Sequence, residues 1–323
     1  MTTIGVSILN FQAAKETLAC VESLLRAGRS AQLEIALRVE VADNHSDGPD
    51  FECLAAGLEG MDGVSLHRHE GNLGFAAGHN RNIDRLFAGD TPDFIWLLNN
   101  DCEVEPRALR ALLDCARSRP EVGIWGATLL EARDGPLQCA GGCTYRAWLS
   151  AHRSIGEGAP LERLGELPEP HLDYVAGASL FMPAATLLEG LKPPRCLAGK
   201  PKSRWLNEEY FLYFEELDLA HRLRDGVQMA WCRNARIVHS GGSGTGSGAG
   251  RRSPGGEYHS TLSALKFTRL YLPGQFWLAA PSRLLVKSFV NLLTLRFDLL
   301  RALFRAYRDY FAWRQAAHEV NQQ

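Results

Sequence analysis

The sequence predicts an α/β protein with a mostly parallel sheet, and its first 120 residues carry the evidence. Apolar runs of strand length alternate there with segments whose apolar residues recur at helical spacing. This order favours a parallel, doubly wound sheet, because each helix carries the chain back to the same edge. A polar turn follows the predicted strands at that edge. These strands lie near residues 3–11, 33–41, 64–67 and 94–98.

Composition narrows the class of protein. The 323 residues suffice for one or two domains, and a formal net charge of −2 gives no electrostatic basis for binding nucleic acid. None of the eight cysteines has Cys-x-x-Cys spacing, so we expect reduced thiols in a cytosolic protein. Residues 1–7 lack a basic region followed by a long apolar core, and we interpret them as a first strand rather than a signal peptide.

The predicted strand at residues 94–98 ends in Asn99, Asn100, Asp101, Cys102 and Glu103. A buried strand that delivers oxygen ligands at its carboxyl end is how open α/β sheets place a binding site. Such ligands suit a hard divalent cation, Mg²⁺ or Mn²⁺. The alternative is a turn followed by a helix cap, because Asn and Asp are common caps.

After residue 120 the pattern changes. We expect a hairpin at 136–148, a strand over 174–182, an acidic segment at 205–224 and a strand leading to His239. Residues 240–256 are rich in Gly and Ser, which predicts a flexible loop that closes over a ligand, or else an inert linker.

The tail, about 260–315, combines apolar and aromatic residues with many arginines. No uncharged stretch approaches the roughly 20 residues that span a bilayer. Basic amphipathic helices with aromatics suit a membrane surface. The alternative is that they pack on the rest of the chain or on a second subunit, as in a homodimer.

Seven stretches, in this order, resemble the family-2, inverting, nucleotide-sugar glycosyltransferases, and within them the bacterial rhamnosyltransferase-like group. The resemblance covers about residues 3–240 and implies a GT-A fold, a Rossmann-like nucleotide-diphospho-sugar transferase architecture. It divides the chain into a catalytic domain (1–240), a Gly-rich loop (241–257) and C-terminal amphipathic helices (258–323). The stretches are Val6–Phe11, Val41–Gly48, Gly71–Asn80, Leu97–Asp101, Val175–Ala178, Tyr213–Leu219 with Arg222, and Val238–His239.

The resemblance implies that the donor, a nucleotide-diphosphate sugar, is held by residues from several turns. Asp43 would accept a hydrogen bond from the base or ribose, although a turn role of the Asx type is the alternative. Small residues at the start of the next helix allow close backbone approach, and helix amino termini favour phosphate. The implied nucleotide-sugar-binding residues are Asn10, Asp43, Asn72, Gly74, Asn99, Asn100, Arg251 and Arg252.

The resemblance also implies a metal site. The family's motif is usually Asp-x-Asp, but Asn99 stands here at the first acidic position. Asp101 is therefore the principal expected ligand, with Glu103 and His239 as further candidates. The metal would bridge the diphosphate and stabilise it as it leaves.

The acidic segment carries the implied catalytic base. Aligned with the family pattern, Glu216 removes the proton from the acceptor hydroxyl, whereas the register of rhamnosyltransferase-like members indicates Glu215. The alternative for both acids is that they only favour the positive end of a helix. Asp218 has the i, i+4 spacing for an ion pair with Arg222.

These implications predict a metal-dependent glycosyltransferase that moves L-rhamnose from dTDP-rhamnose onto a hydroxyl of a cell-surface glycan or lipid-linked acceptor. One alternative is a UDP-hexose, UDP-N-acetylhexosamine or galactofuranose donor. Another is a catalytically silent nucleotide-sugar-binding scaffold. We expect the enzyme in the cytoplasm, peripheral on the inner face of a bacterial plasma membrane.

Overall fold

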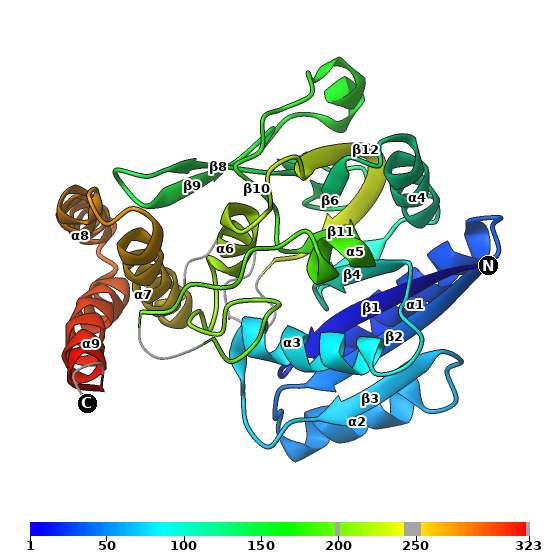
Figure 1. Ribbon diagram of the computed structural model, residues 1–323, viewed down its shortest axis with the longest axis horizontal. Helices are drawn as coiled ribbons and strands as arrows, with labels where there is room; N and C mark the ends of the chain where they lie inside the picture. Colours follow the sequence, from blue (N-terminus) through cyan, green and yellow to red (C-terminus); the bar gives the residue numbers. More distant parts are fainter. Residues whose placement is uncertain (198–200, 242–252, 321–323) are drawn as a thin grey trace.

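The computed structural model describes residues 1–197, 201–241 and 253–320, with side chains through residue 313. Its main element is one large sheet with the strand order β3-β2-β1-β4-β11-β6-β12-β5, and β7 pairs with β6 (Figure 1). The strands are β1 (Thr2–Asn10), β2 (Ile35–Asp43), β3 (Val64–Arg68), β4 (Phe94–Leu98), β5 (Cys102–Val104), β6 (Val122–Leu130), β7 (Leu137–Ala140), β11 (Ser179–Pro183) and β12 (Gln228–His239).

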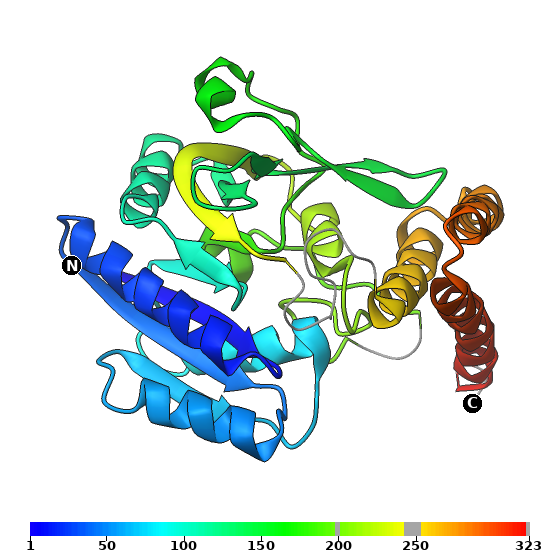
Figure 2. The ribbon, with the colours of Figure 1, turned by 180° about the vertical axis from the view of Figure 1, so that it is seen from behind.

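The amino-terminal half forms the predicted parallel sheet. Strand β1 pairs in parallel with β2 and β4, and β2 pairs in parallel with β3. Helix α3 (Gly74–Phe87) packs on one face, and α1 (Ala14–Ser30) and α2 (Gly48–Leu58) cover the other, as Figures 1 and 2 show from opposite sides. Helix α4 (Ala108–Ser118) contacts α1 and packs on β6 and β12. Strand, helix and turn therefore recur as predicted.

The second half mixes strand directions. Strand β11 lies antiparallel between β4 and β6, while β12 is parallel to β6 and antiparallel to β5. The strand predicted over 174–182 is two strands, β10 (Tyr174–Val175) and β11. Helix α5 (Ala184–Leu188) follows β11, and α6 (Glu215–His221) precedes β12.

The hairpin predicted at 136–148 is wrong. Strand β7 joins the large sheet, whereas β8 (Gly142–Arg146) pairs with β9 (Ala151–Ser154) and β10 in a smaller sheet. Gly141, with φ +80°, turns the chain between the two sheets, and a Cβ there would press on Trp231. A 3₁₀ helix, η1 (Leu161–Glu166), lies in the loop that follows β9.

Three helices form the carboxyl-terminal layer: α7 (Pro254–Tyr271), α8 (Phe276–Leu293) and α9 (Phe297–Val320). Helix α7 joins the main core through Phe267, and α8 and α9 pack on α7 at the edge of the molecule away from the sheet (Figures 1 and 2). Their own core contains Phe276, Leu303 and Tyr310. Among the described residues, no helix combines the length and apolar character needed to cross a membrane.

Candidate active site

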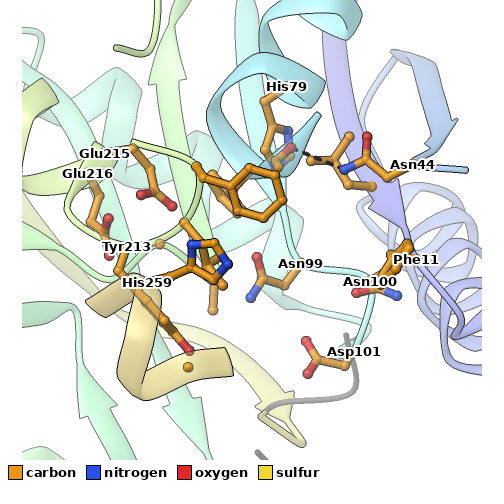
Figure 3. A pocket seen from close by; sticks show the side chains of 18 of the residues that line it. Phe11, Asn44, His79, Asn99, Asn100, Asp101, Tyr213, Glu215, Glu216 and His259 are labelled. Atoms are coloured by element: carbon orange, nitrogen blue, oxygen red, sulfur yellow. Dashed lines mark hydrogen bonds between the residues drawn. The ribbon is translucent and has the colours of Figure 1, made fainter. Parts of the chain in front are cut away.

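A cavity of about 570 Å³ opens where β1, β2 and β4 end, between the starts of α3, α6 and α7. Figure 3 shows Glu215 and Glu216 at one end of it and Phe11 and Asn44 at the other, with Asp101 between them. Of the predicted site residues, those that line the cavity are Asn72, Gly74, Asn99, Asn100, Asp101, Glu215, Glu216 and His239. The topology thus gathers most of them at one sheet edge, as parallel strands do.

Asp101 and His239 meet because β12 pairs antiparallel with β5, which starts directly after Asp101. The Nε2 atom of His239 lies 3.3 Å from Oδ1 of Asp101. On the other side of the ring, Nδ1 donates to Oε1 of Gln138 at 2.6 Å. This bond orients the ring so that Nε2 faces the carboxylate. Gln138, which sequence reasoning missed, orients the histidine.

An imidazole nitrogen beside a carboxylate is a donor set that Mg²⁺ or Mn²⁺ accepts. The Cys102 sulfur also lies near these two groups. However, burial raises its pKa well above the usual range, and the thiol points to the Ala178 carbonyl at 3.5 Å. A hard cation also prefers oxygen and imidazole ligands to sulfur. The structure therefore fits a divalent cation at Asp101 and His239, not at Cys102.

Glu103 does not join this cluster. Its carboxylate is partly exposed and pairs with Arg133, and it does not line the cavity. Side chains alternate along a strand, so Glu103 and its neighbour Cys102 point to opposite sides of β5. The geometry thus separates two acids that lie two positions apart in the sequence.

Asn99 and Asn100 both face the cavity. The Asn99 amide lies 3.3 Å from Nε2 of His239, and the Asn100 amide donates to Oγ1 of Thr17 at 3.0 Å. The backbone of this turn is held by the Asn99 N–H, which donates to the Ala178 carbonyl at 3.0 Å. Asn99, at the position where the family has an acid, lies beside the proposed ligand His239.

Asn10 and Asp43 are fully buried and do not line the cavity. The Asn10 amide donates to Oδ1 of Asp43 at 2.9 Å, and Oδ2 of Asp43 accepts from the Ser46 N–H at 3.0 Å. Both Asp43 oxygens therefore hold the turn together, which is the Asx-type alternative. Arg68 lies 3.4 Å from the same carboxylate.

The residues that follow, Phe11 and Asn44, line the cavity instead. The Asn44 amide nitrogen donates to the Gly74 carbonyl at 3.1 Å, whereas its buried Oδ1 has no hydrogen-bond partner within the described structure. That oxygen is an acceptor available to a ligand. At the ends of β1 and β2, the residue that lines the cavity is therefore the one directly after the predicted residue.

Gly74 begins α3 with φ +77°, and a Cβ there would clash with the Phe211 carbonyl. The Phe75 N–H donates to that carbonyl at 2.7 Å. Asn72 accepts from the Gly74 N–H at 2.9 Å. Glycine is required here because the chain around Phe211 approaches the helix start at van der Waals distance.

Glu215 and Glu216 start α6 directly after two non-glycine residues in the left-handed region, Tyr213 (φ +68°) and Phe214 (φ +74°). Such strain clusters at functional sites, where the fold enforces it. Burial raises the pKa of Glu216 to about 7. Burial and the neighbouring Glu216 raise the pKa of Glu215 well above its usual range. At neutral pH Glu216 is therefore divided between its protonated and ionised forms.

A smaller cavity of about 220 Å³ lies behind Glu216, between α6, β12 and the small sheet. It shares Gly177, Ala178, Tyr213, Glu216 and His239 with the larger cavity. A Cβ on Gly177 would approach Oε1 of Glu216 to 3.3 Å, so the wall between the cavities is thin there. Glu216 borders both spaces, whereas Glu215 borders only the larger one.

Asp218 is buried in an ion pair with Arg222, with Nε 2.6 Å from Oδ1. Its Oδ2 accepts from Asn207 at 2.9 Å and from the Tyr271 hydroxyl at 2.7 Å. The predicted i, i+4 pair is therefore present. Asp218 fixes α6 against α7 rather than lining the cavity.

Asp218→Asn should lower the free energy of unfolding by about 3 kcal/mol or more, because it leaves the buried Arg222 charge uncompensated. Urea denaturation followed by circular dichroism measures the change. Asp114→Asn is the matched control, since Asp114 forms an exposed i, i+4 pair with Arg110. It should cost less than about 1 kcal/mol. Equal losses of unfolding free energy in the two variants would show that the buried ion pair contributes no more to stability than the exposed one.

Two histidines that the sequence did not single out also line the cavity, His79 and His259. Burial lowers the pKa of His79 to about 3, and its Nδ1 lies 2.7 Å from Oγ of Ser7. His259 stacks on Phe211, and burial lowers its pKa as well. Both rings are neutral at pH 7. Arg251 and Arg252, predicted near phosphate, lie outside the described residues.

Sequence comparison identifies two relatives, both named N-acetylglucosaminyl-diphospho-decaprenol L-rhamnosyltransferase, from Mycobacterium tuberculosis strains CDC 1551 / Oshkosh and ATCC 25618 / H37Rv. Each is 27% identical over 245 residues, which cover 68% of this chain and 72% of the relative. No family model matches the chain.

Solved structures share the fold. GalNAc-T7, crystallised with UDP, GalNAc and Mn²⁺, matches with a TM-score of 0.54 at 14% identity, over 74% of this chain and 44% of that one. The crystal structure of S. aureus TarS 1-349 in complex with UDP-GlcNAc matches with a TM-score of 0.52 at 12% identity, over 96% and 80% of the two chains. The resemblance drawn from the motifs is confirmed: the chain is a glycosyltransferase of the GT-A fold, similar in sequence to bacterial rhamnosyltransferases.

Proposed function

We propose that the chain is a metal-dependent inverting glycosyltransferase that moves L-rhamnose from dTDP-rhamnose to a hydroxyl of a lipid-linked glycan. The observation that carries the proposal is the position of Glu216. This carboxylate borders both cavities, and the larger one also holds the Asp101–His239 pair. One space can take the donor and the other an acceptor sugar, with a proton acceptor between them. The sugar and the lipid-linked acceptor follow the printed name of the relatives.

In the proposed reaction the donor lies in the larger cavity, with its nucleotide toward Phe11 and Asn44 and its diphosphate toward Asp101 and His239. The unpartnered Oδ1 of Asn44 accepts a hydrogen bond from the nucleotide. A divalent cation bound by Asp101 and His239 would supply positive charge to the departing diphosphate. Glu103 is left out of the proposed ligand set, because it pairs with Arg133.

The acceptor hydroxyl reaches the anomeric carbon from the side of the smaller cavity. Its oxygen forms the new bond as the bond to the diphosphate breaks, and its proton passes to a carboxylate oxygen of Glu216. A single displacement of this kind inverts the anomeric configuration. Burial and the neighbouring Glu216 raise the pKa of Glu215, which disfavours two negative charges on the pair.

Thermal stabilisation by nucleotide sugars tests the donor. With Mn²⁺ present, dTDP-rhamnose should raise Tm more than UDP-N-acetylglucosamine, UDP-galactose or UDP-galactofuranose, because ligands that bind only the native state stabilise it by mass action. Release of dTDP in the presence of a polyprenyl-diphosphate-linked N-acetylglucosamine acceptor then measures transfer. Stabilisation by a UDP-sugar alone would move the assignment to another donor. Stabilisation without any product would favour a silent binding protein.

The acceptor chemistry also indicates where the enzyme works. The relatives act, by their name, on a sugar carried by a decaprenol diphosphate, which is a membrane lipid. We therefore place this chain in the bacterial cytoplasm at the inner face of the plasma membrane, in the biosynthesis of a cell-surface polysaccharide.

A further inference from the structure

Helix α8 exposes large apolar side chains, which is unusual for a surface helix. Trp277 is 68%, Leu285 69% and Phe289 64% exposed. Its buried side combines apolar residues with the polar groups of Arg283, 4% exposed, and Asn291, 0% exposed. The exposed residues that we call the outer face of α8 are Trp277, Leu278, Pro281, Leu285, Val286, Phe289, Leu292 and Leu293.

The cations of α8 are all turned inward and bound. Arg283 donates to the carbonyl of Ser150 and to Oγ of Ser260 at 2.9 Å. Lys287 forms a 2.7 Å ion pair with the buried carboxylate of Glu257. The outer face therefore has no charge along its whole length, although a helix in contact with water normally turns its charges to that side. An apolar surface of this size indicates a binding surface.

The apolar surface continues through Leu295 into α9, where its character changes. Phenylalanine and arginine alternate there along one exposed stripe, at spacings of three and four residues. The α9 stripe consists of Phe297, Arg301, Phe304, Arg308 and Phe311. Phe297, Arg301, Phe304 and Arg308 also line an open groove of about 560 Å³. Arginines between apolar side chains can extend their guanidinium groups toward phosphate while the rings stay in an apolar phase.

We propose that the outer face of α8 and the α9 stripe bind the surface of an anionic lipid bilayer. The helices would lie in the plane of the interface, with the α8 side chains among the acyl chains and the α9 arginines at the phosphates. Two tryptophans suit this depth: Trp277 on the outer face and the half-exposed Trp148. Trp148 lies in the turn between β8 and β9, which Arg283 ties to α8 through Ser150.

Charge favours a bilayer over a second copy of the chain. Residues 294–313, which follow α8 and include the described part of α9, contain four arginines against two aspartates. A twofold dimer would bring this positive surface against itself, because the same patch meets on both subunits. An anionic bilayer neutralises it instead, while its acyl chains bury the outer face of α8. The position of the layer at the edge of the molecule leaves the face open to a flat surface (Figure 1).

Co-sedimentation of the full chain with vesicles tests the proposal independently of any sugar transfer. The chain should bind vesicles that contain 30% phosphatidylglycerol in phosphatidylcholine. Its binding to vesicles of phosphatidylcholine alone should be at least tenfold weaker. The double variant Leu285→Glu with Phe289→Glu should lose binding to both at least tenfold. The double variant Arg301→Gln with Arg308→Gln should lose the preference for anionic vesicles while keeping the weak binding to neutral ones.

Leu188→Glu is the matched control, because it makes the same kind of change on the partly exposed α5, away from both helices. It should bind vesicles like the unaltered chain. Circular dichroism and stabilisation by nucleotide check that each variant is folded. Absence of vesicle binding by the unaltered chain would overturn the proposal. So would a lipid-free dimer in analytical ultracentrifugation that the Leu285→Glu, Phe289→Glu variant dissociates, since a second copy would then cover the face.

Discussion

Glu216→Gln should lower kcat for sugar transfer about 10³-fold and leave the Kd for the nucleotide-sugar donor within about twofold. A glutamine has nearly the same shape but cannot accept the proton of the acceptor hydroxyl, and general base catalysis contributes about 10² to 10⁴ in rate. Single-turnover transfer and donor titration by calorimetry separate the two effects. An unchanged kcat would remove Glu216 from the reaction.

The pH dependence should identify the same residue. A general base works in its ionised form, and burial raises the pKa of Glu216 to about 7. The kcat of the unaltered enzyme should therefore rise between pH 6 and pH 8 and then level off. The residual rate of Glu216→Gln should show no such rise. Glu215→Gln serves as the comparison, because Glu215 borders only the larger cavity and burial raises its pKa well above the usual range.

The raised pKa of Glu216 makes the folded state less stable as the pH rises, whereas kcat increases. Between about pH 4.5 and pH 7, Glu216 is protonated in the folded state but ionised in the unfolded chain. The stability contributed by that proton is present at low pH and is lost as the pH rises through this window. Glu216→Gln should thus be less active but have a higher Tm than the unaltered enzyme at pH 8.

A larger rate loss in Glu215→Gln than in Glu216→Gln would assign the base to Glu215.

Asp101→Asn should weaken Mn²⁺ binding at least 100-fold and lower kcat by about 10² to 10³. The change removes the carboxylate that faces Nε2 of His239 at 3.3 Å, while the amide keeps the size of the side chain. Charge neutralisation on a leaving diphosphate is worth several kcal/mol, which sets the expected loss of rate. Calorimetric titration of Mn²⁺ in the presence of dTDP, and transfer rates at saturating Mn²⁺, give the two values.

Glu103→Gln provides the matched control for that experiment. It also neutralises an acid of the Asn99–Glu103 segment, but the Glu103 carboxylate pairs with Arg133 outside the cavity. Mn²⁺ affinity and kcat should stay within about twofold. Equal effects in the Asp101 and Glu103 variants would mean that the metal is bound elsewhere in this segment.

The sequence predicted the parallel half of the fold because its signals are local. Strand length, helical spacing and polar turns each occupy fewer than about 20 consecutive residues, and right-handed connections then fix the order of the sheet. Strands β7 and β8 do not pair with each other: β7 pairs with the preceding strand β6, and β8 pairs with the following strand β9 and with β10. An apparent hairpin at 136–148 could not reveal that Gly141 sends its two strands into different sheets.

The motifs mark the cavity only approximately, because neighbouring residues of one motif can face different ways. Asp43 and Asn10 belong to a buried network with Thr17, Ser46 and Asp50, so Asn44 and Phe11 line the cavity instead. Nothing local distinguishes these alternatives, because the network joins two distant segments, 10–17 and 43–50. Gln138 contacts His239 across 101 positions of the chain, and glutamine at a strand start carries no signal of its own.

Strand β11 runs antiparallel to both β4 and β6, so it separates two groups of strands in the large sheet. The strands before that boundary contribute Phe11, Asn44, Asn72 and Asp101, on the side where we place the donor. The elements beyond it contribute Glu216 and His239, together with the small sheet that encloses the second cavity. If the donor and the acceptor bind as we propose, donor preference and acceptor preference reside in separable segments of the chain. Exchange of residues 130–240 between related enzymes should change which acceptor is glycosylated while preserving the sugar that is delivered.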